Sequence, residues 1–215
     1  MMILGATVAV CTPGLAQAGS NGDFGIGVSG GTLGIGGDLS WRVNSGFSVS
    51  AGYSGYSVSK GFSESGVEYS GKLDLRNIPV FLNWHPFGGS FRLAAGAVFQ
   101  DSRARGSATP TAPVELGGVT YDPAVVGSFT LSGDARFANS TMPYLGLGWT
   151  GRFGESSWGG FVDAGVMFTG STKVRLSSSN AAVAQSDLQA ESASVQDGSQ
   201  ISVYPVLRFG ITYNF

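Results

Sequence analysis

The chain has 215 residues, of which 35 are glycine and only 12% are charged, about half the usual share of ~25%. This length is enough for one sizeable β domain. The net charge is −2 and the sequence contains no basic cluster, which argues against nucleic-acid binding. After the N-terminus, no apolar run approaches the ~18 residues that a membrane helix needs.

The first residues, MMILGATVAVCTPGLAQAGS, predict a secretory signal peptide. A short apolar stretch leads to a small-x-small motif at 16–18, so cleavage is expected after Ala18. The expected domain organisation is therefore a signal peptide over 1–18 and one β-barrel domain over 19–215. The segment lacks the usual basic start, and a buried N-terminal strand or helix is the alternative. Cys11 is the only cysteine, so the mature chain would have no disulfide or thiol chemistry.

Eight segments of the mature chain alternate apolar and other residues with a period of two, as strands with one face against an apolar medium do. The last one, ISVYPVLRFGITYNF, is apolar at every odd position from Ile201 to Phe215. Leu33 is expected to face outward on the second segment, directly after a turn at Gly30-Gly31. The eight segments are 24–28, 33–42, 47–58, 73–84, 91–99, 142–150, 158–176 and 201–215.

The connections between these segments alternate between short and long. The short ones contain NSG, HPFGG and GRFGES, and the long ones cover 104–138 and 177–200, the second with a short helix expected in AVAQSDLQAESASV. Outer-membrane barrels have an even number of strands, short periplasmic turns and longer outer loops. The pattern predicts an all-β fold, an eight-stranded antiparallel transmembrane β-barrel with up-and-down topology. Leu73 and Leu75 break the alternation, which predicts a bulge near Arg76, with a similar one near Gly55.

The tryptophans provide a separate test, because each lies beside a short connection with outward parity. Aromatic rings with an apolar body and a polar edge settle at the membrane interface. A soluble β-barrel, the alternative, would bury its tryptophans centrally. The predicted periplasmic aromatic girdle consists of Trp41, Trp84, Trp149, Trp158, Tyr213 and Phe215.

The C-terminal YPVLRFGITYNF resembles the terminal signature read by the outer-membrane barrel assembly machinery. With GTLGIG, NWHPFGGSFRLAAGAVF and PYLGLGW, the mature chain resembles the small eight-stranded outer-membrane proteins of Gram-negative bacteria, the OmpA-transmembrane/OmpW-like group. The resemblance implies export to the outer membrane, contact with its lipid and lipopolysaccharide, and recognition by the assembly machinery through the strand ending at Phe215. It implies no activity and no cofactor.

Charged residues with inward parity form the first candidate site. An eight-stranded barrel is about wide enough for side chains to fill, and buried charges need partners. Asp163 and Arg208 are expected to pair across neighbouring strands, with Asp38 as a second acceptor. The network is either a structural plug or a polar conduit or gate, since the inward glycines make room for side chains or for water. Its predicted members are Asp38, Arg42, Arg92, Asp163 and Arg208.

A second group of charges lies near the outer strand ends, as a solvated rim or as a contact for lipopolysaccharide phosphates. Two further motifs indicate little chemistry. The GxGxxG match at 25–30 lacks the helix that a dinucleotide site needs, and His85, the only histidine, lies in a periplasmic turn without a Ser/His/Asp arrangement or a metal-ligand set. The rim residues are Lys72, Arg76, Arg103, Arg105, Lys173 and Arg175.

The sequence therefore favours a non-enzymatic outer-membrane barrel with a structural or surface-interaction role, in which the long connections are the contact surfaces. A narrow conduit for a small or apolar molecule is the alternative. An outer-membrane lipid-modifying enzyme is a third possibility. The sequence specifies neither a ligand nor an oligomeric state.

Overall fold

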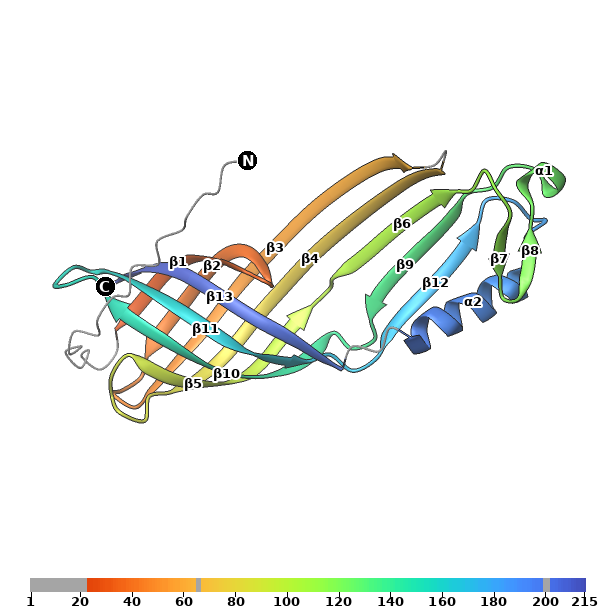
Figure 1. Ribbon diagram of the computed structural model, residues 1–215. Coiled ribbons are helices and arrows are strands. Elements are labelled where there is room, and N and C mark those ends of the chain that lie inside the picture. Colours follow the sequence, from red (N-terminus) through yellow and green to blue (C-terminus); the bar gives the residue numbers. More distant parts are fainter. Residues whose placement is uncertain (1–22, 65–66, 199–201) are drawn as a thin grey trace, which may run out of the picture.

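The computed structural model describes residues 23–64, 67–198 and 202–215 (Figure 1). Eight antiparallel strands form a closed barrel in which each strand pairs with its neighbours in chain order, and the last strand pairs with the first. This confirms the predicted fold class, whereas the predicted signal peptide lies outside the described residues. The barrel strands are β1 (Phe24–Gly31), β2 (Gly34–Arg42), β3 (Phe47–Glu64), β4 (Val67–Trp84), β5 (Phe91–Gln100), β10 (Thr141–Arg152), β11 (Trp158–Phe168) and β13 (Val203–Asn214).

Part of the barrel wall continues beyond one end within the same sheet, and we call this part the extension (Figure 1). It contains the far ends of β3 and β4 together with β6 (Arg103–Thr109), β9 (Leu131–Phe137) and β12 (Thr172–Ser178), in that spatial order. β6 prolongs β5, because both pair with β4 in one unbroken register. The predicted loop over 104–138 is therefore largely sheet.

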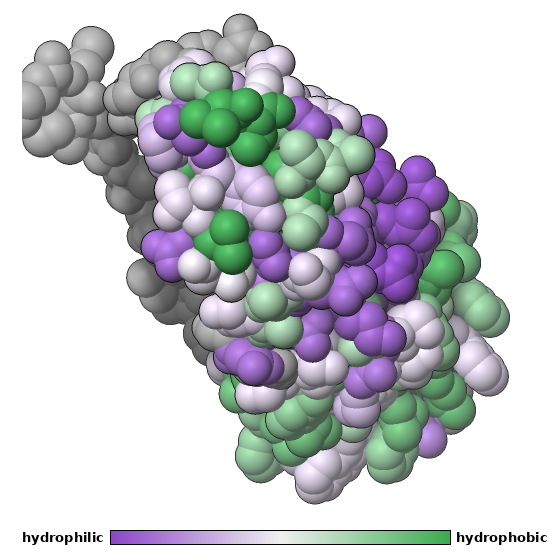
Figure 2. Space-filling view, turned by 90° about the vertical axis from the view of Figure 1, so that its right-hand side faces the viewer, coloured by the Kyte–Doolittle hydropathy of each residue, from purple (hydrophilic) through white to green (hydrophobic). Residues whose placement is uncertain are grey.

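The tip of the extension has a small core of its own. The hairpin β7 (Val114–Leu116) and β8 (Val119–Tyr121), α1 (Pro123–Val126) and α2 (Gln185–Gly198) surround it. α2 confirms the helix expected in the second long connection. In the view onto this end, hydrophilic residues are spread over the face with small apolar patches between them (Figure 2). The core residues are Leu116, Tyr121, Phe129, Val183 and Leu188.

α2 also covers the free edge of β12. The backbone N–H of Val174 donates to Gln196 Oε1 at 3.4 Å, and that of Leu176 donates to Ser192 Oγ at 3.0 Å. These bonds occupy edge groups that would otherwise be available to pair with another chain. Neither helix in the described part of the chain has the length and apolar character needed to cross a membrane.

The turn between the first two strands differs from the prediction. β1 runs to Gly31 and β2 starts at Gly34, so Thr32 and Leu33 form the turn, not Gly30-Gly31. Leu33 points into the barrel and is only 2% exposed, which contradicts its predicted outward position. The turn is held inward because Asn77 Nδ2 donates to the Leu33 carbonyl at 2.8 Å.

The predicted bulges near Gly55 and Arg76 do not occur. Ala51 pairs with Val80 and Ser54 with Asn77, so each strand has the same number of residues between these pairs. The reversed parity of Leu73 and Leu75 instead marks where the strands leave the barrel. Beyond this level the face that continues the outside of the barrel is polar, and the apolar residues lie on the opposite face.

The predicted seventh strand, 158–176, is divided into β11 and β12. Gly170 interrupts it with a φ of 70°, a left-handed conformation that favours glycine. Val174 pairs with Ala135, which pairs with Ala104, so it lies on the face of the extension that continues the inside of the barrel. Because Val174 and Leu176 share the even numbering of the outward Trp158, alternation predicts that they face the lipid, and this prediction is wrong.

The outer surface of the barrel is an apolar belt. Its side chains are between 37% and 68% exposed, although they are large and hydrophobic. A water-soluble monomer does not normally expose a continuous patch of this kind. The belt includes Ile26, Val28, Ile35, Leu39, Ile78, Val80, Leu82, Leu93, Leu145, Leu147, Val162, Leu207, Phe209 and Ile211.

Candidate functional site: the barrel interior and the extension

An ionic layer crosses the inside of the barrel. Arg92 Nη2 lies 2.7 Å from Asp163 Oδ1, and Arg208 Nη1 lies 3.7 Å from Asp163 Oδ2. Arg208 also pairs with Asp38, on β2, which accepts a second hydrogen bond from Ser29 Oγ. The layer therefore contains two cations and two anions. All four side chains are buried, with exposed fractions between 3% and 10%.

Aromatic rings cover the arginines of this layer. The Arg92 guanidinium lies 5.5 Å from the Phe161 ring centroid, and that of Arg208 lies 5.4 Å from the same ring and 5.5 Å from that of Phe81. Such contacts stabilise a desolvated cation. Neither ring was predicted to have this role.

Glycines make room for the layer. A Cβ added to Gly148 would collide with Asp163 Oδ1, one added to Gly165 would approach the Tyr144 hydroxyl to 2.5 Å, and one added to Gly210 would approach Phe161 to 2.6 Å. These inward glycines therefore lie against interior side chains. The space that the sequence left open to side chains or water is occupied by protein at these positions.

An apolar layer closes the barrel on the side toward the extension. Leu33, from the β1–β2 turn, packs among side chains that are at most 4% exposed. Phe81 and Tyr144 stack with ring centroids 4.3 Å apart and connect this layer to the ionic one. The buried members are Leu33, Phe81, Ala94, Val98, Met142, Tyr144, Met167 and Val206.

Arg42 does not join the ionic layer. It is the last residue of β2, four residues beyond Asp38 and thus ~13 Å along the strand. Its Nη2 donates to the backbone carbonyls of Ser45 and Gly88, in the turns at the opposite end from the extension.

The predicted girdle residues lie at that same end. Trp41, Trp84, Trp149 and Trp158 are between 44% and 53% exposed, and each flanks a short turn or the chain ends. Several contact other aromatic rings. Trp158 lies 5.3 Å from Tyr213, which lies 5.2 Å from Phe215, as measured between ring centroids.

A serine–histidine pair occurs at this end, which the sequence analysis did not predict. Ser48 Oγ lies 3.0 Å from His85 Nε2, and His85 Nδ1 lies 3.1 Å from the Gly89 carbonyl. Burial, followed by the Arg42 charge, lowers the pKa of His85 from its ordinary value, so the ring is neutral. Ser48 is 8% exposed and His85 is 2% exposed. The pair is therefore buried in the packing of the barrel end, where a substrate cannot reach the serine hydroxyl.

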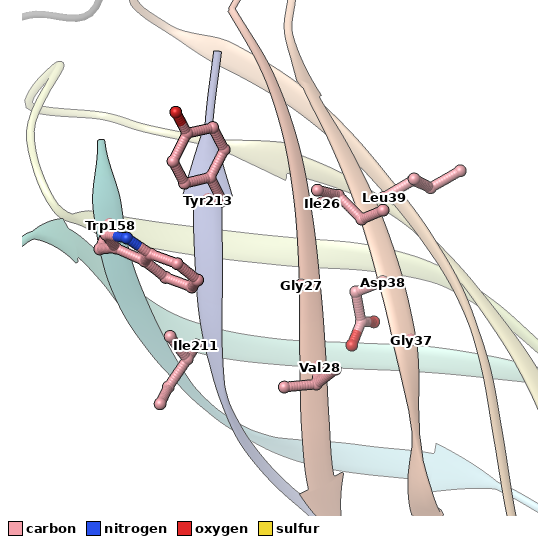
Figure 3. Close-up of a pocket in the computed structure, with 9 residues that line it drawn as sticks. All are labelled: Ile26, Gly27, Val28, Gly37, Asp38, Leu39, Trp158, Ile211 and Tyr213. Atoms are coloured by element: carbon pink, nitrogen blue, oxygen red, sulfur yellow. The ribbon is translucent and has the colours of Figure 1, made fainter.

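A shallow apolar hollow of about 560 Å³ lies on the outside of the barrel, over β1, β2, β11 and β13. Figure 3 shows Trp158, Ile211 and Tyr213 on one side of it and Ile26, Val28 and Leu39 on the other. Gly37, which faces outward between Val28 and Tyr53, leaves the hollow open. It belongs to the apolar belt. The one charged residue of its lining, Asp38, is already bound to Arg208 and Ser29.

The rim residues are gathered on one face of the extension, which we call the basic face. It continues the outer surface of the barrel, and directly paired residues on β4, β6, β9 and β12 form three rows across it. The rows are Asp74, Arg103, Arg136 and Lys173; then Lys72, Arg105, Asp134 and Arg175; then Ser70, Ser107, Ser132 and Ser177. Arg76 lies below them and is exposed. Arg136 was not among the predicted rim residues, because it lies in a segment that was predicted to be a loop.

A groove of about 670 Å³ runs across the extension, with residues of the second and third rows along its lining. The hydroxyls of Ser70 and Ser107 are 2.8 Å apart. Hydrogen bonding from Ser57 lowers the pKa of Asp74, as does nearby Lys72, so this carboxylate is ionised. Among the described residues, no group of three or more His, Cys, Asp or Glu side chains has metal-site geometry.

The closed eight-stranded barrel, its apolar belt and its aromatic end define the class of protein: a transmembrane β-barrel with the architecture of Gram-negative outer-membrane proteins. Two crystal structures from Acinetobacter baumannii have a similar fold. CarO2 is 23% identical over 92% of this chain and 100% of its own, with a TM-score of 0.64. CarO is 24% identical over 89% of this chain and 97% of its own, with a TM-score of 0.61. No family model matches the chain, and neither does any curated protein.

Proposed function

We propose that this protein is a non-enzymatic, integral outer-membrane barrel that holds the extension at the cell surface, in a structural or surface-interaction role. The observation that carries the proposal is the filled interior. The ionic layer and the apolar layer follow one another along the barrel axis, and their side chains are nearly all buried. The extension then presents its two faces and the tip outside the membrane.

Single-channel recording in planar bilayers tests this proposal. The purified barrel is expected to produce no conductance steps, because Leu33 and the ion pairs fill its cross-section. Steps from the wild-type protein would instead favour the narrow conduit. The conduit requires the Thr32–Leu33 turn to move out of the barrel, so a Leu33→Ala variant should then conduct more frequently than the wild type.

The partners of this role are outer-membrane lipid, lipopolysaccharide and, during biogenesis, the barrel assembly machinery. The apolar belt supports lipid contact. β13, which ends beside the final Phe215 and closes the barrel against β1, supports recognition of the C-terminal strand. Deleting Phe215 should lower the yield of heat-modifiable, folded barrel in the outer membrane, while leaving refolding into detergent micelles intact.

The lipid-modifying enzyme receives less support. Ser48 and His85 form a pair, but both are buried, and the Nδ1 atom of the histidine faces a backbone carbonyl and not a carboxylate. Incubation with lipopolysaccharide followed by mass analysis tests this alternative. Loss of acyl chains that depended on Ser48 would support it.

A further inference from the structure

The basic face has more cations than it can neutralise internally. Its first two rows contain six cations and two anions: Lys72, Arg103, Arg105, Arg136, Lys173 and Arg175 against Asp74 and Asp134. Arg105 lies 3.4 Å from Asp134, and Lys72 lies 3.4 Å from Asp74. Within the described part of the chain, Arg136, Lys173 and Arg175 form no ion pair. The surplus positive charge is thus available to an external anion.

The position of this face identifies the medium that it meets. It is the same side of the sheet as the apolar belt, further along the same strands. Lys72 precedes Trp84 by twelve residues on β4, which places it ~30 Å above the aromatic end at ~3.3 Å per residue and ~40° tilt, just beyond an apolar band ~25 Å tall. A cation at this height, turned toward the lipid, lies at the headgroup level of the outer leaflet.

The groove adds hydrogen-bonding capacity to the charge. Row three supplies four serine hydroxyls next to the cations of row two, along a groove of about 670 Å³. Hydroxyls and guanidinium groups together suit a phosphorylated sugar, since arginine binds phosphate oxygens in a bidentate manner. An apolar groove would suit an acyl chain instead.

We propose that the basic face binds the phosphorylated sugar headgroup of lipopolysaccharide and so holds the extension against the outer leaflet. Arg136, Lys173 and Arg175 supply the uncompensated charge, and the serine row contacts the sugar. This inference rests on the outer-membrane placement proposed above. It commits to the lipid-linked phosphate, because the face is continuous with the lipid-facing surface.

The test compares binding of bisphosphorylated lipid A to wild-type barrel and to the variant R136S/K173S/R175S in detergent micelles, by native mass spectrometry. Each cation near an anionic lipid surface contributes about 1 kcal/mol, so the variant should bind about 100-fold more weakly. These three residues are chosen because their removal breaks no internal ion pair. Dephosphorylated lipid A should bind the wild type as weakly as lipid A binds the variant.

Two controls separate binding from damage to the fold. D74N/D134N removes the anions of the same face and should bind lipid A more tightly than the wild type, a change that misfolding would not produce. R152S, at the opposite end of the barrel, should leave binding unchanged.

Equal affinity of the wild type and the triple variant for lipid A would overturn the inference. So would a wild type that binds inorganic phosphate as tightly as lipid A, because the site would then recognise free anions. If the triple variant still inserts stably into outer-membrane lipid vesicles, either of these results refutes only lipid A binding by the basic face and not the membrane placement. A wild type that failed to insert would instead refute the membrane placement itself.

Discussion

Replacing Asp163 by asparagine should destabilise the barrel more than any other isosteric change in the ionic layer. Asp163 is 2% exposed, accepts a hydrogen bond from Arg92 at 2.7 Å and forms an ion pair with Arg208 at 3.7 Å. The variant D163N leaves Arg92 and Arg208 with Asp38 as the only remaining anion of the layer. Removing one partner from a buried ion pair costs about 3–5 kcal/mol, because a desolvated charge is left uncompensated.

A second variant separates charge balance from loss of shape. R92Q/D163N removes one cation and one anion and leaves Arg208 paired with Asp38. Its loss of unfolding free energy should be smaller than that of D163N by about 1 kcal/mol or more, although it carries one more substitution. R152Q removes the exposed pair of Arg152 with Asp23, at 3.3 Å, and should cost less than about 1 kcal/mol.

Reversible urea unfolding in lipid vesicles measures these differences. The four tryptophans lie at one interface, so their fluorescence reports when the barrel leaves the bilayer. The loss of unfolding free energy in R92Q/D163N is compared with the sum of the losses in R92Q and in D163N. If the two are equal, the four charges act independently, and the reasoning about a balanced layer is refuted.

Three further predictions use the same unfolding assay. L145R places a charge in the apolar belt and should cost about 2–4 kcal/mol, whereas L73R, on the extension, should cost less than about 1 kcal/mol; equal losses would contradict the membrane boundary between them. Because burial lowers the folded-state pKa of His85, the unfolded state binds the proton first, so stability should fall as the pH drops below ~6.5, and an H85Q variant should lose that part of the pH dependence. L33A should cost about 2–5 kcal/mol through the cavity it leaves, and an unchanged unfolding midpoint would show that the turn does not pack inside.

The local alternation of residues was sufficient to predict much of the barrel. Trp149 and Trp158 had outward parity beside a short connection, and both lie exposed at that end. Asp163 and Arg208 had inward parity on strands expected to be neighbours, and they are directly paired. Parity and strand order are properties of short segments, so a single sequence contains them.

Features that depend on a change of medium or on distant pairing were not predictable in this way. Leu73 and Leu75 obey the same alternation as Ile78 and Val80, but their parity is reversed because the strand has passed from hydrocarbon to water. A rule that assumes one medium interprets the reversal as a bulge. The strands around Arg103 and Arg136 are short and largely polar, and they become a sheet only because β4 continues far enough to pair with β6. Leu33 turns inward because Asn77, on β4, holds its carbonyl there. The basic face is thus a consequence of register: its cations are scattered over four segments, and only the continuous pairing of β4, β6, β9 and β12 brings them into rows.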